Sequence, residues 1–317
     1  MTKLKLFVYP NARPHEHDLN PSQTFVNTVP MSRFGISEHF DICDPDEADY
    51  FYMGQFKNDP SIQDYSAKNF EFFEGNEDRH IFDYEGEGGQ EYGSGGNAIP
   101  DWLHNSIFTA NGTLKKYKDL KVYTRPTFTN LLIDIAHNRF DNFILPEETS
   151  MGFTGFLNSE ARGSMLSALS ECRDDTKINV IINDFWSGPA PLGHPIQEEY
   201  ILFMLNNLIS LCPRGSGIDS VRLYETCYFT RVPVLISDHD YFMVGEDEYD
   251  TSFCYRICDE KLDLEYITEE LQKIYDEPIS ELQKRANDAR KYFEEIIRPY
   301  FQDPTLRFLE WLEKNER

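Results

Sequence analysis

The fold is decided by residues 208–240, which read LISLCPRGSGIDSVRLYETCYFTRVPVLISDHD. The apolar run 208–212 predicts a buried strand, and 213–217 predicts a turn because glycine adopts backbone conformations that other residues avoid. A helix is expected to begin after Asp219 or Ser220, since both residue types cap helix N-termini. The β-branched, apolar run 231–237 predicts a second, parallel strand that is buried on both faces. The segment is therefore predicted to be one βαβ unit.

The turn of this unit is predicted to bind a phosphate. A turn after a parallel strand lies at the carboxyl edge of the sheet, where the next helix presents its positive end and unpaired amides. Arg214 lies in the turn and Arg222 in the first helical turn, and arginine can hold a phosphate through two parallel hydrogen bonds. Glu225 can accept hydrogen bonds from a ribose diol. The alternative is an ordinary turn beside an Arg222–Glu225 surface pair.

Three blocks of this stretch, 211–215, 220–225 and 232–238, resemble the signature of the exostosin-type glycosyltransferases. Members of that family have the GT-B fold, in which two Rossmann-like α/β domains face each other across a cleft. They use nucleotide sugars, commonly UDP-sugars, and invert the anomeric centre without a bound metal. The resemblance therefore implies a nucleotide-sugar donor and a glycan or glycoconjugate acceptor.

The resemblance also implies which residues bind the donor. The implied set is Gly155, Arg162, Arg214, Gly215, Ser220, Arg222, Glu225 and Asp238. Residues 150–162 resemble the opening of the family's second domain, where Gly155 would let the backbone approach the diphosphate and Arg162 would add a cation. A solvated helix start is the alternative for Arg162. The chain departs from the family at Thr230, where a glycine is usual at the end of the helix.

The chain is long enough for two domains, each with its own core. Its 317 residues are 40% hydrophobic, which is typical of a globular protein. We expect an N-terminal, acceptor-binding domain over 1–148 and a C-terminal, nucleotide-sugar-binding domain over 149–317. A terminal helix is predicted over 304–316, and the GT-B resemblance implies that it returns to pack on the first domain.

The formal net charge of −25 argues against nucleic acid or an anionic membrane as a partner, because both require a basic face. It also means that a nucleotide sugar approaches against the overall field, so local arginines must attract it. No stretch approaches the ~20 apolar residues of a membrane span, and the N-terminus lacks the apolar core of an export signal. We therefore expect a soluble, cytoplasmic protein with reduced cysteines, of which Cys212 and Cys227 are buried.

The candidate catalytic bases lie in the first domain. Asp18 belongs to an ionisable cluster, His15 to Asp18, which follows the predicted first strand at 5–9. Asp83 and Glu85 end another short strand, just before the glycine-rich stretch 86–96. The sequence does not choose among these three carboxylates.

A metal site is the competing interpretation at Asp238-His239-Asp240. Two acids in this pattern hold a divalent ion on the diphosphate in GT-A glycosyltransferases. Here the arginine-bearing loop already supplies positive charge, so a metal would duplicate its role. No metal cofactor is expected.

The function predicted from the sequence is an inverting, metal-independent glycosyltransferase of glycan biosynthesis. A base of the first domain would deprotonate the acceptor hydroxyl, which attacks the anomeric carbon in a single displacement. Arg214 and Arg222 would stabilise the charge that develops on the leaving diphosphate. Two alternatives remain, a nucleotide-sugar epimerase of the same fold and a non-catalytic subunit that binds a nucleotide sugar or a glycan.

Overall fold

A computed structural model describes the chain over residues 3–9, 36, 38–56, 71–84, 104–111, 113–126, 143–183, 195–215 and 217–315. These residues form two compact units. The first unit takes its described residues from 3–126, from Tyr241–Val244 and from 299–315. The second takes them from 143–240 and 245–298.

The first unit is built on a parallel sheet with the strand order β2-β1-β3-β4-β5-β7. The strands are Leu4–Val8 (β1), Phe40–Ile42 (β2), Tyr50–Phe56 (β3), His80–Tyr84 (β4), Ile107–Asn111 (β5) and Lys121–Arg125 (β7). Short 3₁₀ turns span Pro45–Glu47, Glu77–Arg79 and Lys115–Tyr117. Part of the core is aromatic, with Phe73, Phe82 and Phe108 packed together.

The C-terminal helix α9, Pro304–Asn315, belongs to this first unit. The Asp303 carboxylate accepts a hydrogen bond from the Leu306 N–H at 2.9 Å and so caps the helix. The buried ring of Tyr123 on β7 contacts Phe308 and Trp311, with ring centroids 5.2 and 5.6 Å apart. The unit also contains an antiparallel pair formed by β6, Thr113–Leu114, and β12, Tyr241–Phe242.

The second unit is built on a parallel sheet with the order β13-β11-β10-β8-β9. Its strands are Met151–Phe156 (β8), Ile178–Asn183 (β9), Ile209–Pro213 (β10), Val232–Ser237 (β11) and Tyr255–Cys258 (β13). Every residue of β10 and β11 is buried, which confirms the prediction of a parallel strand covered on both faces. Both units are α/β with parallel sheets, and this is compatible with Rossmann-like domains.

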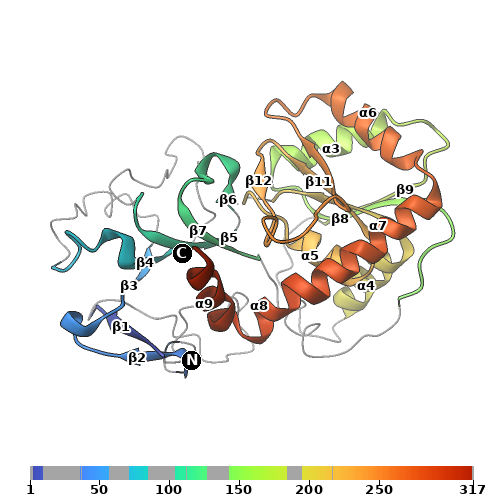
Figure 1. The fold of residues 1–317 in the computed structure, drawn as a ribbon. Helices are drawn as coiled ribbons and strands as arrows, with labels where there is room; N and C mark the ends of the chain where they lie inside the picture. The colour runs from blue at the N-terminus through green and yellow to red at the C-terminus, as the bar shows by residue number, and fades with distance from the viewer. Residues whose placement is uncertain are drawn as a thin grey trace. The chain divides into compact units, whose positions relative to one another are not determined.

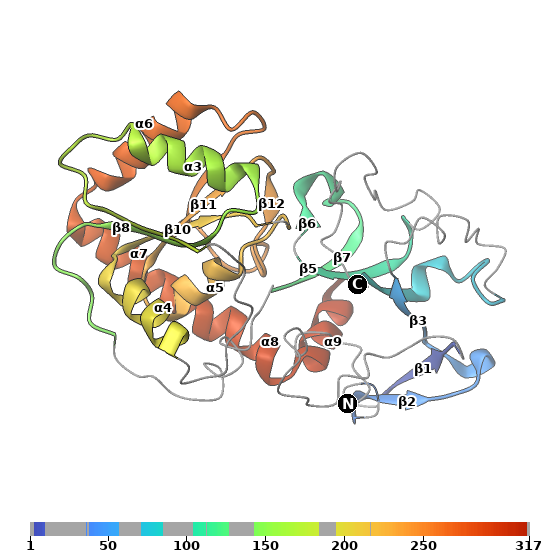
Figure 2. The same ribbon diagram turned by 180° about the vertical axis from the view of Figure 1, so that it is seen from behind.

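Helices cover both faces of the second sheet. They are Glu160–Ser170 (α3), Pro195–Asn206 (α4), Val221–Tyr228 (α5), Leu264–Tyr275 (α6) and Ile279–Tyr292 (α7). Helices α3 and α6 lie on one face and α4, α5 and α7 on the other (Figure 1 and Figure 2). Helix α5 is buried on nearly all sides, because every residue from Leu223 to Tyr228 is buried. As predicted, Cys212 and Cys227 are buried, and no disulfide joins the six cysteines, all of which are described.

The guanidinium of Arg231 joins several segments of the second unit. It donates to the carbonyls of Leu205 at 2.6 Å, Phe229 at 2.8 Å, Thr230 at 2.9 Å and Ile144 at 3.1 Å. Leu205 lies at the end of α4, and Phe229 and Thr230 follow α5, so the cation satisfies carbonyls that helix ends leave unpaired. Thr230 has a φ of +57°, a left-handed conformation that glycine adopts more readily than other residues.

The second unit begins before residue 149, where the sequence placed its boundary. Pro146 accepts a hydrogen bond from Gln283 of α7 at 3.2 Å, and Glu148 pairs with Lys177. Together with the bond from Arg231 to Ile144, these contacts hold 143–148 on the second unit. Residues 143–146 themselves form neither helix nor strand.

A proline within a helical pattern is expected to end the helix, but Pro299 does not do so here. A π-helical segment, Phe293–Ile297, follows α7, and α8 spans Arg298–Gln302 with the proline as its second residue. Within an α-helix a proline ring meets the carbonyl four residues earlier. The wider π turn directly before Pro299 changes the position of that carbonyl, and the first turn of α8 needs no N–H from the proline.

Gly152 of β8 is predicted to be irreplaceable by alanine. A Cβ there would lie 2.6 Å from Cγ of Asn207, a buried side chain that hydrogen bonds hold to Asn179 and to the Phe203 carbonyl. Gly152→Ala should therefore lower the free energy of unfolding by about 1–3 kcal/mol in urea titrations. Gly163→Ala is the matched control, because its Cβ would meet no atom within 4 Å on α3, and it should raise stability by about 0.5–1 kcal/mol. Equal stability of the two variants would contradict the packing described.

Candidate functional site

The candidate site lies at the point where the strand order of the second sheet reverses. Counted along the chain, the order is 2-1-3-4-5, and β8 lies beside β10 although β9 comes between them in sequence. The helices that follow these two strands, α3 and α5, leave toward opposite faces of the sheet (Figure 1). In open α/β sheets the carboxyl ends of strands at such a switch point form the usual ligand site. Arg162, Arg214 and Arg222 all belong to the segments that leave these two strand ends.

The loop after β10 is fixed by hydrogen bonds to its main chain. The Arg214 N–H donates to the Ile236 carbonyl of β11 at 3.0 Å. The Arg214 carbonyl accepts from the Ser159 hydroxyl at 2.7 Å and from Nε of Arg162 at 3.2 Å. Ser159 is the N-cap of α3 and also accepts from the Arg162 N–H at 3.4 Å. These bonds join the ends of β8 and β10 into one rigid edge.

Arg162 and Arg222 approach the same aromatic ring from the two helices. Their guanidinium carbons lie 5.9 and 4.7 Å from the ring centroid of Phe153, which is fully buried on β8. Arg162 donates through Nη1 to the Phe156 carbonyl, and Arg222 donates through Nη2 to the Thr154 carbonyl. Both arginines therefore hold the end of β8, and their flat groups receive cation–π stabilisation from one ring.

Two glycines make room for these guanidinium groups. A Cβ on Gly155 would lie 3.1 Å from Nη2 of Arg222, and one on Gly215 would lie 3.2 Å from Nη2 of Arg162. The sequence assigned Gly155 to the close approach of a ligand. In this structure the atoms that approach the two glycines most closely include the heads of the two arginines, so the glycines position the cations.

The two cations have no carboxylate partner in an ion pair within the described ranges, but their surroundings differ. Burial would lower the pKa of Arg222, yet the neighbouring Tyr200, Cys212 and Glu225 outweigh it and leave that pKa raised. Among the residues that the structure describes, no carboxylate lies within ion-pair distance of the guanidinium of Arg162 or Arg222. Burial, together with the neighbouring charge of Arg222, lowers the pKa of Arg162 to about 10. Nε of Arg222 is buried and has no hydrogen-bond partner in the described part of the chain. Arg162 is therefore a partly buried cation whose charge carries a cost, which a bound anion would relieve.

Arg214 differs from these two because it forms an ion pair. Its Nε and Nη2 donate to the two carboxylate oxygens of Asp238, which directly follows β11. Both side chains are mostly buried, with 13% and 16% of their surfaces exposed. Burial alone would raise the pKa of Asp238, but the hydrogen bonds and charge of Arg214 hold that pKa below its usual value. His239 is a further neighbour, with Nε2 3.8 Å from the carboxylate.

Glu225 lies inside the protein. It is 5% exposed and accepts a hydrogen bond from the Tyr200 hydroxyl of α4, and the Tyr200 ring lies 5.9 Å from the guanidinium carbon of Arg222. The surface Arg222–Glu225 pair considered as an alternative is therefore wrong. Ser220 is the N-cap of α5, and its hydroxyl donates to the Pro213 carbonyl at 3.5 Å, so it too joins the strand end to the helix.

The candidate bases are largely beyond what the structure describes. Asp18 and Glu85 lie outside the described residues, and so does the glycine-rich stretch 86–96. The backbone of Asp83 belongs to β4, where it pairs with Thr109 of β5, but its side chain is not described. These three residues stay predictions.

Three side chains that orient Arg162 and Arg222 were not predicted from the sequence: Phe153, Ser159 and Tyr200. Ser159 had a readable signal, since a serine before a helical pattern is a typical N-cap. Phe153 and Tyr200 had none, because an aromatic residue on a buried strand or helix reads as ordinary core.

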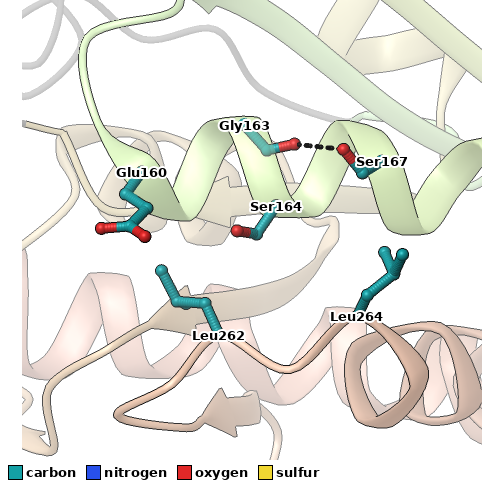
Figure 3. A pocket seen from close by; sticks show the side chains of 6 residues that line it. All are labelled: Glu160, Gly163, Ser164, Ser167, Leu262 and Leu264. Carbon is teal, nitrogen blue, oxygen red and sulfur yellow. Dashed lines mark hydrogen bonds between the residues drawn. The ribbon is translucent and has the colours of Figure 1, made fainter.

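A separate groove runs along α3 beside the segment between β13 and α6 (Figure 3). Its volume is about 360 Å³, and it is lined by Glu160, Gly163, Ser164, Ser167, Leu262 and Leu264. None of these lining side chains is basic, so the groove is unsuited to a phosphate. The arginine-lined strand ends remain the better candidate for an anion site.

Comparison with known proteins adds no name to this geometry. No protein-family model matches the chain, and no curated protein matches it. Within the described residues, no three His, Cys, Asp or Glu side chains gather in a way that could hold a metal ion. In the same part of the chain, no helix is both long and apolar enough to cross a membrane.

The Arg214–Asp238 pair predicts a specific pH dependence. Because the folded-state pKa of Asp238 is lowered, the pair stabilises the protein above the ordinary aspartate value of 3.8, and this contribution disappears as the pH falls through the lower folded value. Asp238→Asn should cost about 1–2 kcal/mol at pH 7, less than for a fully buried pair because solvent screens the charges. The difference in unfolding free energy between wild type and Asp238→Asn should shrink below pH 4, as urea titrations at each pH would reveal. A difference that is constant with pH would show that the ion pair does not stabilise the fold.

Proposed function

We propose that the chain is an inverting glycosyltransferase that uses a nucleotide sugar, commonly a UDP-sugar, and that its two α/β units are the domains of a GT-B enzyme. The acceptor in this proposal is a hydroxyl of a glycan or glycoconjugate. The observation that carries it is the pair of guanidinium groups, Arg162 and Arg222, held without a carboxylate partner in the described structure at the switch point of the second sheet.

The chemistry of this edge suits a diphosphate. A diphosphate offers two anionic groups side by side, and the edge offers two guanidinium groups over one ring, with a third at Arg214 on the adjoining loop. The first turns of α3 and α5 are at the same edge, and the positive end of each helix dipole favours negative charge there. An anion bound here would satisfy the buried Nε of Arg222 and offset the repulsion between the cations.

The same charges support a mechanism without a metal ion. When the bond to the anomeric carbon breaks, negative charge grows on the leaving diphosphate. Arg162 and Arg222 are positioned by main-chain hydrogen bonds, so they need little rearrangement to stabilise that charge, and Arg214 lies on the adjoining loop. The acceptor hydroxyl would lose its proton to a carboxylate of the first unit, with Asp18, Asp83 and Glu85 as the proposed candidates.

The test is UDP binding by an Arg162 variant. Wild type should be stabilised by UDP, by about 2.7 kcal/mol at 100 times the dissociation constant, and the stabilisation should survive a chelator. Arg162→Ala should weaken UDP binding measured by calorimetry and should lower the acceptor-dependent release of UDP from a UDP-sugar by ~10²-fold or more. The affinity of Arg162→Lys for UDP should lie between those of wild type and Arg162→Ala, because lysine keeps the charge but loses the paired donors.

The matched control is Arg173→Ala. Arg173 follows α3 and pairs at the exposed surface with Asp276, so its removal takes the same charge from the same unit without touching the candidate site. It should bind UDP as wild type does. Unchanged UDP binding by Arg162→Ala would overturn the proposed site, and UDP release that needs no acceptor would overturn the proposed transfer reaction.

A further inference from the structure

Asp238 holds the edge of Arg214 that a phosphate would use. The carboxylate accepts from Nε and Nη2 of Arg214, and Nη1 donates to the Gly215 carbonyl at 3.0 Å. A side-on contact through Nε and Nη2 is one of the paired geometries by which arginine binds two oxygens of a carboxylate or a phosphate. A carboxylate and a phosphate therefore cannot both hold that edge of Arg214.

Only the side chains are free to change this arrangement. The main chain of Arg214 is fixed on both sides, through its N–H to Ile236 and through its carbonyl to Ser159 and Arg162. The Asp238 main chain continues directly from β11, whose residues are all buried. A ligand at this edge thus meets an arginine whose position is set and whose charge is already neutralised.

From these contacts we infer that Asp238 is a built-in competitor, which holds Arg214 in the empty site and gives it up to the diphosphate of the donor. This inference rests on the proposed function. It concerns regulation of the same site, since the strength of the Asp238 contact sets how tightly the diphosphate is held.

The charges around the Arg214–Asp238 pair favour an exchange, in which Arg214 leaves Asp238 for the diphosphate, over a permanent ion pair. Arg162 and Arg222 are adjacent cations without a carboxylate partner among the described residues, so a diphosphate gains more from this corner than a single carboxylate does. Once released, Asp238 has a second partner in reach, because Nε2 of His239 lies 3.8 Å from its carboxylate.

If Asp238 competes with the diphosphate for Arg214, its removal should strengthen UDP binding. If Asp238 only supports the position of Arg214, its removal should weaken UDP binding. If Asp238 occupies Arg214 in most molecules, the measured dissociation constant equals the intrinsic one divided by the fraction of molecules that is competent to bind. Asp238→Asn should therefore bind UDP about tenfold more tightly than wild type, measured by titration calorimetry at pH 7 and 25 °C. In the Arg214→Ala background, Asp238→Asn should not increase the affinity for UDP, since the guanidinium for which Asp238 and the diphosphate compete is missing.

Asp240→Asn is the control for charge alone. Asp240 is exposed and lies two residues along the same segment, so its removal takes one negative charge from the neighbourhood without freeing Arg214. Its effect on UDP binding should be much smaller than that of Asp238→Asn. Equal gains from the two variants would mean that only the general field had changed, and the competition would be refuted.

The outcomes separate this inference from the proposed function. If wild type binds UDP and Arg162→Ala does not, the proposed site stands, and unchanged or weaker binding by Asp238→Asn refutes the competition alone. If neither wild type nor Asp238→Asn binds UDP or inorganic pyrophosphate, both proposals fail. Thermal melting of each variant without ligand establishes that the variants being compared are folded.

Discussion

The candidate site depends on two positive charges, those of Arg162 and Arg222, which form no ion pair with a carboxylate in the described part of the chain. Arg162 and Arg222 lie over one ring, at 5.9 and 4.7 Å from its centroid, and the described residues supply no carboxylate within ion-pair distance of either. Taking a cation out of water is costly, and placing two close together adds repulsion. The protein meets this cost through main-chain carbonyls and the face of Phe153, which hold the cations without cancelling their charge.

The local sequence is arranged to maintain this charge. Gly155 and Gly215 leave space for the guanidinium groups, and a side chain at either position would press against them at 3.1–3.2 Å. Ser159 joins the start of α3 to the Arg214 carbonyl, so the helix and the loop present their arginines as one body. In a chain with a net charge of −25, the attraction of an anion has to come from such a local arrangement, because the long-range field opposes it.

The pattern of apolar residues predicted most of the strands and helices of the second unit. The predictions that failed concern contacts between residues far apart in the sequence. Runs such as 232–237 are apolar and β-branched, so the strands could be placed from residue type alone. The boundary at 148 failed because it depends on Arg231, which reaches back to Ile144 across 87 positions. The pairing of Arg214 with Asp238 and the burial of Glu225 against Tyr200 span 24 and 25 positions, and no local pattern reports them. The arginines themselves were predictable because they flank strand ends at the carboxyl edge of the sheet.

A comparison of Arg231 with Arg162 and Arg222 shows why the latter two indicate a ligand and Arg231 does not. Arg231 lies where α4 and α5 end, and its donors meet three carbonyls at helix ends that carry partial negative charge, besides that of Ile144. Burial lowers the pKa of Arg231 to about 10, and burial together with the charge of Arg222 lowers that of Arg162 to about 10. Arg162 and Arg222, however, lie in the first turns of α3 and α5, where the helix adds positive charge. A cation at the wrong end of a helix loses about 0.3–1 kcal/mol, and only an anion brought from outside can turn both helix ends and both cations to advantage.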